Sequence, residues 1–370
     1  MSNTSITTTT TISSDLLRAA IVLPIFDKYM IIIIYTCGCF GSLLNILVFL
    51  QKRLRIKSCS VYFLLHSLVD FSFLNSFILM TLISLFNSKL FSSINSTNVW
   101  CKVGNYFYFI LPCLTSTCLI FASIDRFCAS SSSNRLHKIN QLKISYLLAF
   151  LILLVWTGFA LHTVIEYDFR LNSANKIQCT PHIYNEQLFI IIDGYFFASF
   201  NGIVTPLFLI LFGLLIVRNI NQIHRRTHPQ SSSAMLSAGN RQSNVRFTQG
   251  NQHLIRMLLF QNCLAVFLNI PYVTLYLYGI YNTKPQYWLS LLLYSIFTYI
   301  ARWFWFMNFS KSFYVNILCS QTFRNVLVRR LLYVLSSRQN RTRIDRSIPR
   351  LQVHIPTSYN SDYDLELTRR

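Results

Sequence analysis

The sequence predicts an all-α membrane protein, a seven-transmembrane helix bundle with a short interfacial amphipathic helix after the last span. Two observations predict this fold class. Seven long apolar stretches alternate with connectors that carry most of the charge, and the composition is 53% hydrophobic, 15% aromatic and only 12% charged. Because backbone polar groups find no water inside a bilayer, apolar stretches of this length are expected to be helices.

Each predicted span is long enough to cross a hydrocarbon core of about 30 Å, which takes about 20 helical residues. The spans cover residues 29–50, 60–85, 103–126, 143–166, 188–217, 254–280 and 287–316. The bundle as a whole is predicted over 29–317, after an extracellular N-terminal tail over 1–28. The Gln-, Ser- and Arg-rich connector over 218–253 is typical of a disordered loop.

Two further segments follow the last span. Over residues 318–335, apolar side chains such as Phe323, Val326 and Leu327 recur at helical spacing with arginines on the other face. This pattern predicts a helix lying in the membrane interface. Residues 336–370 are expected to form a disordered cytoplasmic tail. Cys319, beside the interfacial helix, is a candidate for lipidation.

The formal net charge of +21 does not indicate a nucleic-acid partner, because the Lys and Arg residues gather in the connectors on one side of the spans. By the positive-inside rule, this asymmetry places the N-terminus outside and the C-terminus in the cytoplasm. We therefore expect a multi-pass protein of the plasma membrane, in contact with membrane lipids. Asn3 and Asn95 begin sequons on the predicted outer side and are candidate glycosylation sites.

The ten cysteines divide by compartment. Only Cys101 and Cys179 fall in predicted outer connectors, where the setting is oxidising, so we predict a disulfide between them. The sequence has no CxxC pair and no Cys/His cluster with zinc spacing. No cofactor is predicted.

Ionisable side chains inside spans are functional candidates, because a charge in a bilayer is unfavourable. Asp70 lies in the second span, Asp125 and Arg126 end the third, and Arg302 and Lys311 lie in the seventh. For Asp125 and Arg126 the alternative is a helix-end salt bridge at the headgroups. Arg302 is far from either end of its span, so we expect it to face a hydrated, ligand-accessible cavity.

The order and spacing of these residues resemble the rhodopsin-like (class A) G-protein-coupled receptors across all seven spans. The matching positions are Asn45, Asp70, Cys101, Asp125-Arg126-Phe127 in place of Asp-Arg-Tyr, Trp156, Pro206, Pro271 and Phe323-Arg324.

The chain departs from the family pattern in two motifs. Leu268-Asn269-Ile270-Pro271 stands where the family has Cys-Trp-x-Pro, and Ser312-Phe313-Tyr314-Val315-Asn316 stands for Asn-Pro-x-x-Tyr. Such variants resemble divergent invertebrate receptors grouped with neuropeptide (FMRFamide-like) receptors.

The resemblance implies a receptor, not an enzyme, that transduces binding of an extracellular ligand into activation of a heterotrimeric G protein. It implies that Asp125, Arg126 and Phe127 form the G-protein coupling motif, with Arg126 paired to Asp125 at rest. The positions that would face the ligand are Tyr108, Pro112, Asn269, Tyr272, Tyr276 and Arg302. The alternative for the tyrosines is packing.

The ligand is predicted from these positions. Tyr108 occupies the place of the aspartate of amine receptors, which argues against a monoamine. Arg302 could hold an anionic group, and aromatic residues around it would supply apolar contact. A peptide is therefore the leading ligand.

A second group of positions matches those that ring a sodium ion in the family: Asn45, Asp70, Thr115, Asn308 and Ser312. A buried hydrogen-bond network without an ion is one alternative, and a Lys311–Asp70 pair that excludes sodium is another. No other metal is predicted.

Two other functions stay open at this point. A chemosensory receptor for small molecules fits the same fold. A channel or transporter would call for Gly-rich discontinuous spans or a line of polar residues through one helix, which the sequence lacks.

Overall fold

The structure, a computed structural model, describes residues 4–131, 141–171, 177–180, 190–227, 238–281 and 287–336, most of them helical. Within these ranges, seven helical stretches are long and apolar enough to cross a membrane. They are Ile21–Phe49, Ser58–Phe86, Asn98–Ser130, Leu142–Glu166, Gly194–Gln222, Ile255–Gly279 and Leu289–Ser310. The predicted fold class, an all-α seven-helix membrane bundle, is confirmed.

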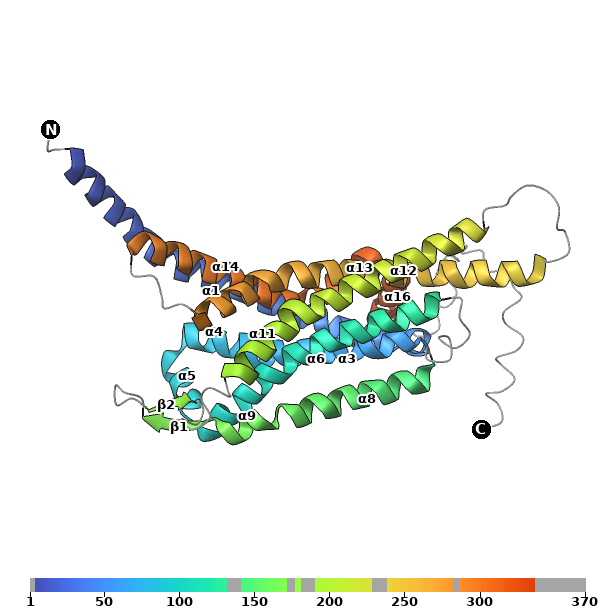
Figure 1. The fold of residues 1–370 in the computed structure, drawn as a ribbon, viewed down its shortest axis with the longest axis horizontal. Coiled ribbons are helices and arrows are strands. Elements are labelled where there is room, and N and C mark those ends of the chain that lie inside the picture. Colours follow the sequence, from blue (N-terminus) through green and yellow to red (C-terminus); the bar gives the residue numbers. More distant parts are fainter. Residues whose placement is uncertain are drawn as a thin grey trace. The chain divides into compact units, whose positions relative to one another are not determined.

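The elements follow one another in the order that Figure 1 shows. The first three spans are built from α1 (Thr4–Phe49), α2 (Lys52–Arg55), α3 (Ser58–Phe73), the π-helical η1 (Leu74–Ile78), α4 (Leu79–Phe86), α5 (Ser88–Asn95) and α6 (Asn98–Ser130). The fourth and fifth contain α8 (Leu142–Phe159), α9 (Leu161–Glu166), the strands β1 (Asp168–Leu171) and β2 (Ile177–Thr180), η3 (Ile190–Phe196), α11 (Phe197–Ser199), η4 (Phe200–Val204) and α12 (Thr205–Thr227). The chain continues with α13 (Ala238–Tyr281), α14 (Trp288–Ser310), α15 (Ser312–Cys319) and α16 (Gln321–Ser336).

Several helices begin or end elsewhere than the sequence predicts. α1 begins at Thr4, inside the segment predicted as a tail. α12 continues to Thr227 and α13 begins at Ala238, so the prediction of a disordered loop is wrong for 218–227 and 238–253. A formed helix gains one hydrogen bond for each residue it adds, so apolar spans propagate into polar flanks. Residues 228–237 and 337–370 lie outside the described residues.

By compactness the chain divides into Met1–Arg324 and Asn325–Arg370, and all seven spans belong to the first unit. Its centre is α6, because 78% of the apolar window of this span is buried, against 17–39% for the other six. α6 packs against α3, α8, α12 and α13. A side chain on α6 can therefore touch several other spans, and several of the polar contacts described below involve it.

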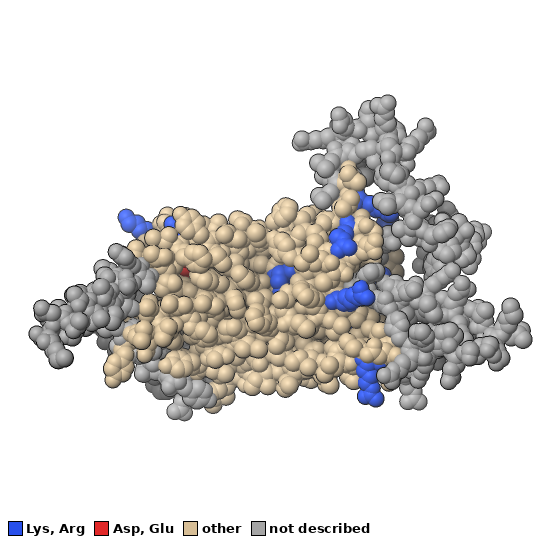
Figure 2. All heavy atoms as spheres, turned by 90° about the horizontal axis from the view of Figure 1, so that it is seen from above, with Lys and Arg blue, Asp and Glu red and all other residues tan. Residues whose placement is uncertain are grey.

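The outer surface of the bundle is apolar. Large exposed apolar side chains follow the outward faces of several spans, for example Leu43, Leu47, Phe150, Leu154, Leu207 and Leu214. On the face that Figure 2 shows, Lys and Arg side chains are most frequent toward one end, and the few charged groups elsewhere are separated by wide uncharged surface. An exposed apolar surface of this extent is what a surrounding bilayer would cover.

Consecutive spans run in opposite directions, so their connectors alternate between two ends of the bundle. We call one of them the basic end, because it carries the exposed side chains of Lys52, Arg55, Lys143, Arg218, Arg256 and Arg324. The opposite end carries α5, the antiparallel β1–β2 pair and the start of α6. There Thr97 caps α6 by accepting a hydrogen bond from the Trp100 N–H at 3.3 Å.

Candidate functional site

An arginine–carboxylate pair lies at the basic end of α6. The Arg126 Nη2 donates to Asp125 Oδ2 at 2.6 Å, and both residues are buried. Ser58, at the start of α3, donates to the same carboxylate oxygen at 3.0 Å and accepts from Arg126 at 3.3 Å. The pair is therefore held between two helices. The neighbouring Phe127 is half-buried and packs against Phe212 of α12, with ring centroids 5.9 Å apart.

Asp70 of α3 is the centre of a buried polar cluster in the middle of the bundle. Its two carboxylate oxygens accept hydrogen bonds from Thr115 of α6 and Ser312 of α15, each at 3.0 Å. His66, one turn earlier on α3, brings its Nε2 to 3.5 Å from Asp70 and 3.0 Å from the Ser312 hydroxyl. A charged carboxylate away from water is tolerated when donors surround it in this way.

Lys311 stands at the break between α14 and α15, and it is buried. Its ammonium donates to the backbone oxygen of Asn308 at 2.7 Å and also to the Asn308 side-chain oxygen. The amide of Asn308 in turn donates to Asn269 of α13 at 3.1 Å. Asn269, predicted to face a ligand, is buried and belongs to this internal chain of hydrogen bonds.

A separate amide chain lies closer to the basic end. Gln261 of α13 donates to Asn316 of α15 at 2.7 Å, and Asn316 donates to Asn45 of α1 at 3.1 Å. Asn45 and Asn308 are thus engaged by different partners from those of Asp70. The predicted sodium positions therefore take part in separate sets of hydrogen bonds.

Aromatic side chains fill the half of the bundle away from the basic end. The hydroxyls of Tyr108 on α6 and Tyr272 on α13 touch each other. The Tyr272 ring stacks on Trp305 of α14, with centroids 4.2 Å apart and ring planes 4° apart. The Phe197 ring of α11 contacts the rings of both Tyr108 and Tyr276, with centroid distances of 6.3 and 5.9 Å. The three predicted tyrosines therefore do come together, as one aromatic cluster shared by four helices.

Pro112 lies within α6, one turn after Tyr108 of the aromatic cluster, and its side chain is buried. A proline within a helix removes one backbone hydrogen bond and tends to kink the helix. Pro271 occupies the corresponding kind of position in α13, next to Tyr272. The two prolines flank the aromatic contact between α6 and α13.

Arg302 has a partner that the sequence did not reveal. Its Nη2 lies 2.6 Å from Asp27 Oδ2 of α1, and the neighbouring Trp303 donates to Asp27 Oδ1 at 2.7 Å. Asp27 is only 2% exposed, whereas the Arg302 side chain is 31% exposed. The expectation that Arg302 holds an anionic group of a ligand has to be amended, because the guanidinium is already neutralised by a carboxylate of the chain itself.

The predicted disulfide is present. Cys101 near the start of α6 is bonded to Cys179 of β2. β2 pairs with β1 in antiparallel register, with Cys179 opposite Phe169. The bridge thus ties the connector between the fourth and fifth spans to the central helix. Of the two candidate glycosylation sites, Asn95 is exposed at the end of α5 and Asn3 lies outside the described residues.

Sequence reasoning missed several residues of these sites, Asp27, Ser58, Gln261 and Trp305 among them. Asp27 was assigned to a tail, although an acidic residue next to an apolar run is a signal for a paired charge. Ser58 and Trp305 carried no signal, since hydroxyl and aromatic side chains are common in membrane helices.

These observations define a class of protein: a seven-helix membrane protein with a buried arginine–carboxylate pair at its basic end and an aromatic cluster in its other half. A family model described as 7 transmembrane receptor (rhodopsin family) matches residues 41–308. The match spans more than half of the chain, so the chain belongs to the rhodopsin family of seven-transmembrane receptors. Proteins of this family are multi-pass membrane receptors and not enzymes, and their partners are an extracellular ligand and a G protein. Comparison with curated proteins gave no match.

Proposed function

We propose that this receptor lies in the plasma membrane with its N-terminus outside, binds an extracellular ligand, and activates a heterotrimeric G protein through Arg126. The observation that carries the proposal is the buried Asp125–Arg126 pair, braced by Ser58. A guanidinium stays charged and has several donors, so it can exchange one acceptor for another when a partner reaches it. The pair with Asp125 is then the resting state, and Arg126 facing the G protein is the active one.

The orientation rests on the exposed charge. At the basic end six exposed Lys and Arg side chains surround the helix ends, and cytoplasmic loops of membrane proteins carry such an excess. With the basic end in the cytoplasm, the Cys101–Cys179 disulfide lies outside, where disulfides persist. Asn95 then faces the compartment in which glycosylation occurs.

The aromatic cluster is the proposed place of ligand action. Tyr272, Tyr276 and Tyr108 contact one another or share neighbours, and the rings offer flat apolar area with polar tips. A ligand that inserts an aromatic side chain would compete for the stacking of Tyr272 on Trp305. We retain a peptide as the leading ligand and a small chemosensory molecule as the second candidate.

A packed route connects this cluster to the polar network. The ring centroids of Trp305 and Phe73 of α3 are 5.0 Å apart, and Phe73 stacks on Phe309 with centroids 3.7 Å apart. Phe309 follows Asn308, whose amide donates to Asn269. A ligand that favours a different arrangement of the rings can therefore bias the relative position of α13 and α14. Such a bias shifts a two-state equilibrium only by the difference in binding free energy.

We further propose that Asp70 works within a hydrogen-bond network rather than as a sodium ligand. Its oxygens already accept hydrogen bonds from Thr115 and Ser312. The ammonium of Lys311 donates to both oxygens of Asn308, so they are occupied as well. A cationic side chain that interacts with Asp70 is an unfavourable neighbour for sodium. Activity measured in sodium and in choline chloride of equal ionic strength should then be the same.

The test of the proposed function is G-protein dissociation in cells that express the chain at the surface, during exposure to a pool of short amidated peptides. Arg126→Ala is compared with Arg55→Ala, an exposed arginine of the same end, at matched surface expression. The proposal expects a response that disappears in Arg126→Ala and persists in Arg55→Ala. A response that survives Arg126→Ala would refute the coupling role.

A further inference from the structure

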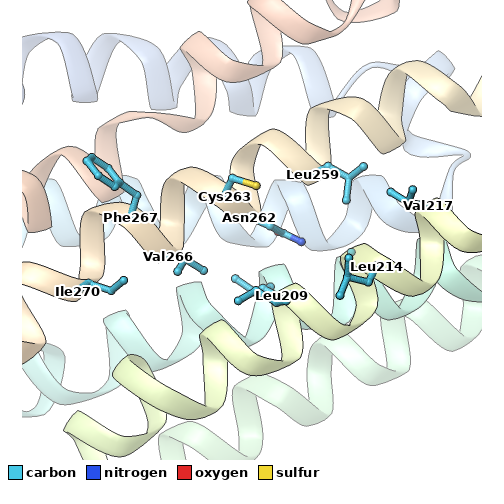
Figure 3. A pocket seen from close by; sticks show the side chains of 11 residues that line it. Leu209, Leu214, Val217, Leu259, Asn262, Cys263, Val266, Phe267 and Ile270 are labelled. Carbon is cyan, nitrogen blue, oxygen red and sulfur yellow. The ribbon is translucent and has the colours of Figure 1, made fainter.

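A groove of about 560 Å³ runs between α12 and α13. Figure 3 shows side chains of the two helices on either side of it. Its lining belongs to the apolar stretches of the fifth and sixth spans, and nearly all of it is hydrocarbon. The α12 side is lined mainly by Leu209, Leu214 and Val217, and the α13 side by Leu259, Val266 and Phe267.

The groove opens to the outside of the bundle. Leu214 and Phe267 are 65% and 61% exposed, so the surrounding bilayer has direct access to it. Its volume falls in the range of small-molecule sites, about 300–1,000 Å³. At its floor the two helices approach closely, because a Cβ added to Gly213 would lie 3.3 Å from Leu259 Cδ2.

One polar side chain interrupts the apolar lining. Asn262 of α13 is only 4% exposed, and its Nδ2 donates to the Ser123 hydroxyl of α6 at 2.9 Å. Its Oδ1 has no hydrogen-bond partner among the described residues. A buried acceptor without a donor is unfavourable, and more so where lipid replaces water. The groove therefore offers an apolar surface, and one hydrogen-bond acceptor without a donor lies directly beneath it.

We propose that this groove binds a membrane sterol, whose single hydroxyl donates to Asn262 Oδ1 and whose rigid apolar body lies along Val266 and Ile270. An acyl chain alone would cover the apolar lining but would leave the amide oxygen without a donor. A sterol has both required parts in one molecule that the bilayer itself supplies. The site differs from the aromatic cluster, which lies in the other half of the bundle, although α13 contributes side chains to both.

The direction of the groove fits a sterol of the leaflet at the basic end. Asn262 is two turns from Ile255, where the sixth span begins at that end, or about 10 Å along the helix. Ile270 lies about 12 Å further toward the middle of the bilayer. The hydroxyl thus lies toward the membrane surface and the apolar body toward its centre, which is how an amphipathic molecule lies in a leaflet.

The sterol would also affect signalling, and this part rests on the function proposed above. Asn262 joins α13 to Ser123, which precedes Asp125 and Arg126 on α6. A donor on Oδ1 strengthens the Nδ2–H bond to Ser123, because linked hydrogen bonds polarise one another. A bound sterol would therefore hold α13 against α6 and lower basal G-protein activation.

Binding is tested on the purified full-length chain in lipid nanodiscs that contain a photoreactive analogue of cholesterol. After irradiation, crosslinked peptides are mapped by mass spectrometry. We expect crosslinks on the peptides of α12 and α13 that contain Leu214 and Phe267, in excess over the lipid-facing surface of α8 around Leu154. Excess cholesterol should compete, whereas its ketone analogue, which has no hydroxyl donor, should compete about five- to tenfold less well.

Two variants separate hydrogen bonding from packing. Asn262→Leu removes the acceptor and should reduce groove crosslinking about five- to tenfold, while Val266→Trp should block it by filling the groove. Leu154→Trp, on the exposed surface of α8, should leave groove crosslinking unchanged.

If Asn262→Leu does not fold, Val266→Trp and the ketone analogue still test whether a sterol occupies the groove through its hydroxyl. Crosslinking spread evenly over the apolar surface, or equal competition by alcohol and ketone, would overturn the proposal. The assay contains no G protein, so failure of the proposed function would not alter its result.

Discussion

Removing the carboxylate of Asp27 is expected to destabilise the folded receptor by about 2 kcal/mol. Asp27 accepts charge-assisted hydrogen bonds from Arg302 at 2.6 Å and from Trp303 at 2.7 Å. A hydrogen bond to a charged group is worth about 1.5–3 kcal/mol. The Arg302 side chain is 31% exposed, so solvent screens its charge and weakens its hydrogen bond to Asp27. In the variant, the guanidinium can bond to water instead. We therefore assign about 1 kcal/mol to each bond.

The assay is thermal unfolding of the purified chain in nanodiscs, followed by tryptophan fluorescence and by thiol labelling of buried cysteines. At about 1–2 °C per kcal/mol for a chain of this length, Asp27→Ala should lower the Tm by about 2–4 °C. A double-mutant cycle with Arg302→Gln isolates the pair and should give a coupling of about 1 kcal/mol. Lys89→Gln, at an exposed lysine of α5, serves as the control and should leave the Tm nearly unchanged. A fully additive cycle would refute the reasoning, because it would mean that the two charges do not interact.

Two further predictions concern the fold. Gly202→Ala should destabilise the chain by about 1–3 kcal/mol, because the new Cβ would overlap Val273 Cγ1. Gly279→Ala should not, because its new Cβ would have nothing within 4 Å. Equal Tm values for the two variants would contradict the close approach of η4 to α13. For the disulfide, Cys101→Ala, Cys179→Ala and the double variant should lose the same stability, measured as Tm, because the bridge closes one loop with a sequence separation of 78. A double variant clearly less stable than either single one would mean that the cysteines act independently.

The sequence was sufficient to predict the seven spans, because a bilayer permits few backbone structures and requires long apolar segments. It was also sufficient for the Cys101–Cys179 disulfide, because these are the two cysteines in the predicted outer connectors. The Asp125–Arg126 pair could be predicted because the two residues are adjacent in the chain. The orientation of the bundle, the ligand and the coupling partner remain predictions. They depend on a membrane and on molecules that the chain meets outside itself.

The contacts between distant helices could not be predicted from the sequence. Arg302 was expected to face a ligand because it lies far from either end of its span, and its partner, Asp27, lies 275 residues away in the chain. The family resemblance placed Asn269 at the ligand, yet its amide oxygen accepts a hydrogen bond from Asn308. In each case the outcome depends on how one helix is rotated against another. Apolar periodicity is weak in a helix that is apolar on all sides, so it does not fix that rotation.

The resting pair at the basic end is the feature on which the proposed function depends. Asp125→Asn keeps the size of the side chain and an oxygen for Ser58, but it removes the charge that holds Arg126. The two-state equilibrium should shift toward the active state by about 1–3 kcal/mol, or about 5- to 150-fold. Arg126→Ala should prevent coupling whether or not Asp125 is changed.

The most direct measurement is ligand-free nucleotide exchange on a purified heterotrimeric G protein by the chain in nanodiscs. Asp125→Asn, Arg126→Ala and the double variant are compared at equal amounts of folded protein. We predict raised exchange for Asp125→Asn and none above background for the other two. Raised exchange in the double variant would contradict the account, because activation would then proceed without the arginine that it places at the centre of coupling.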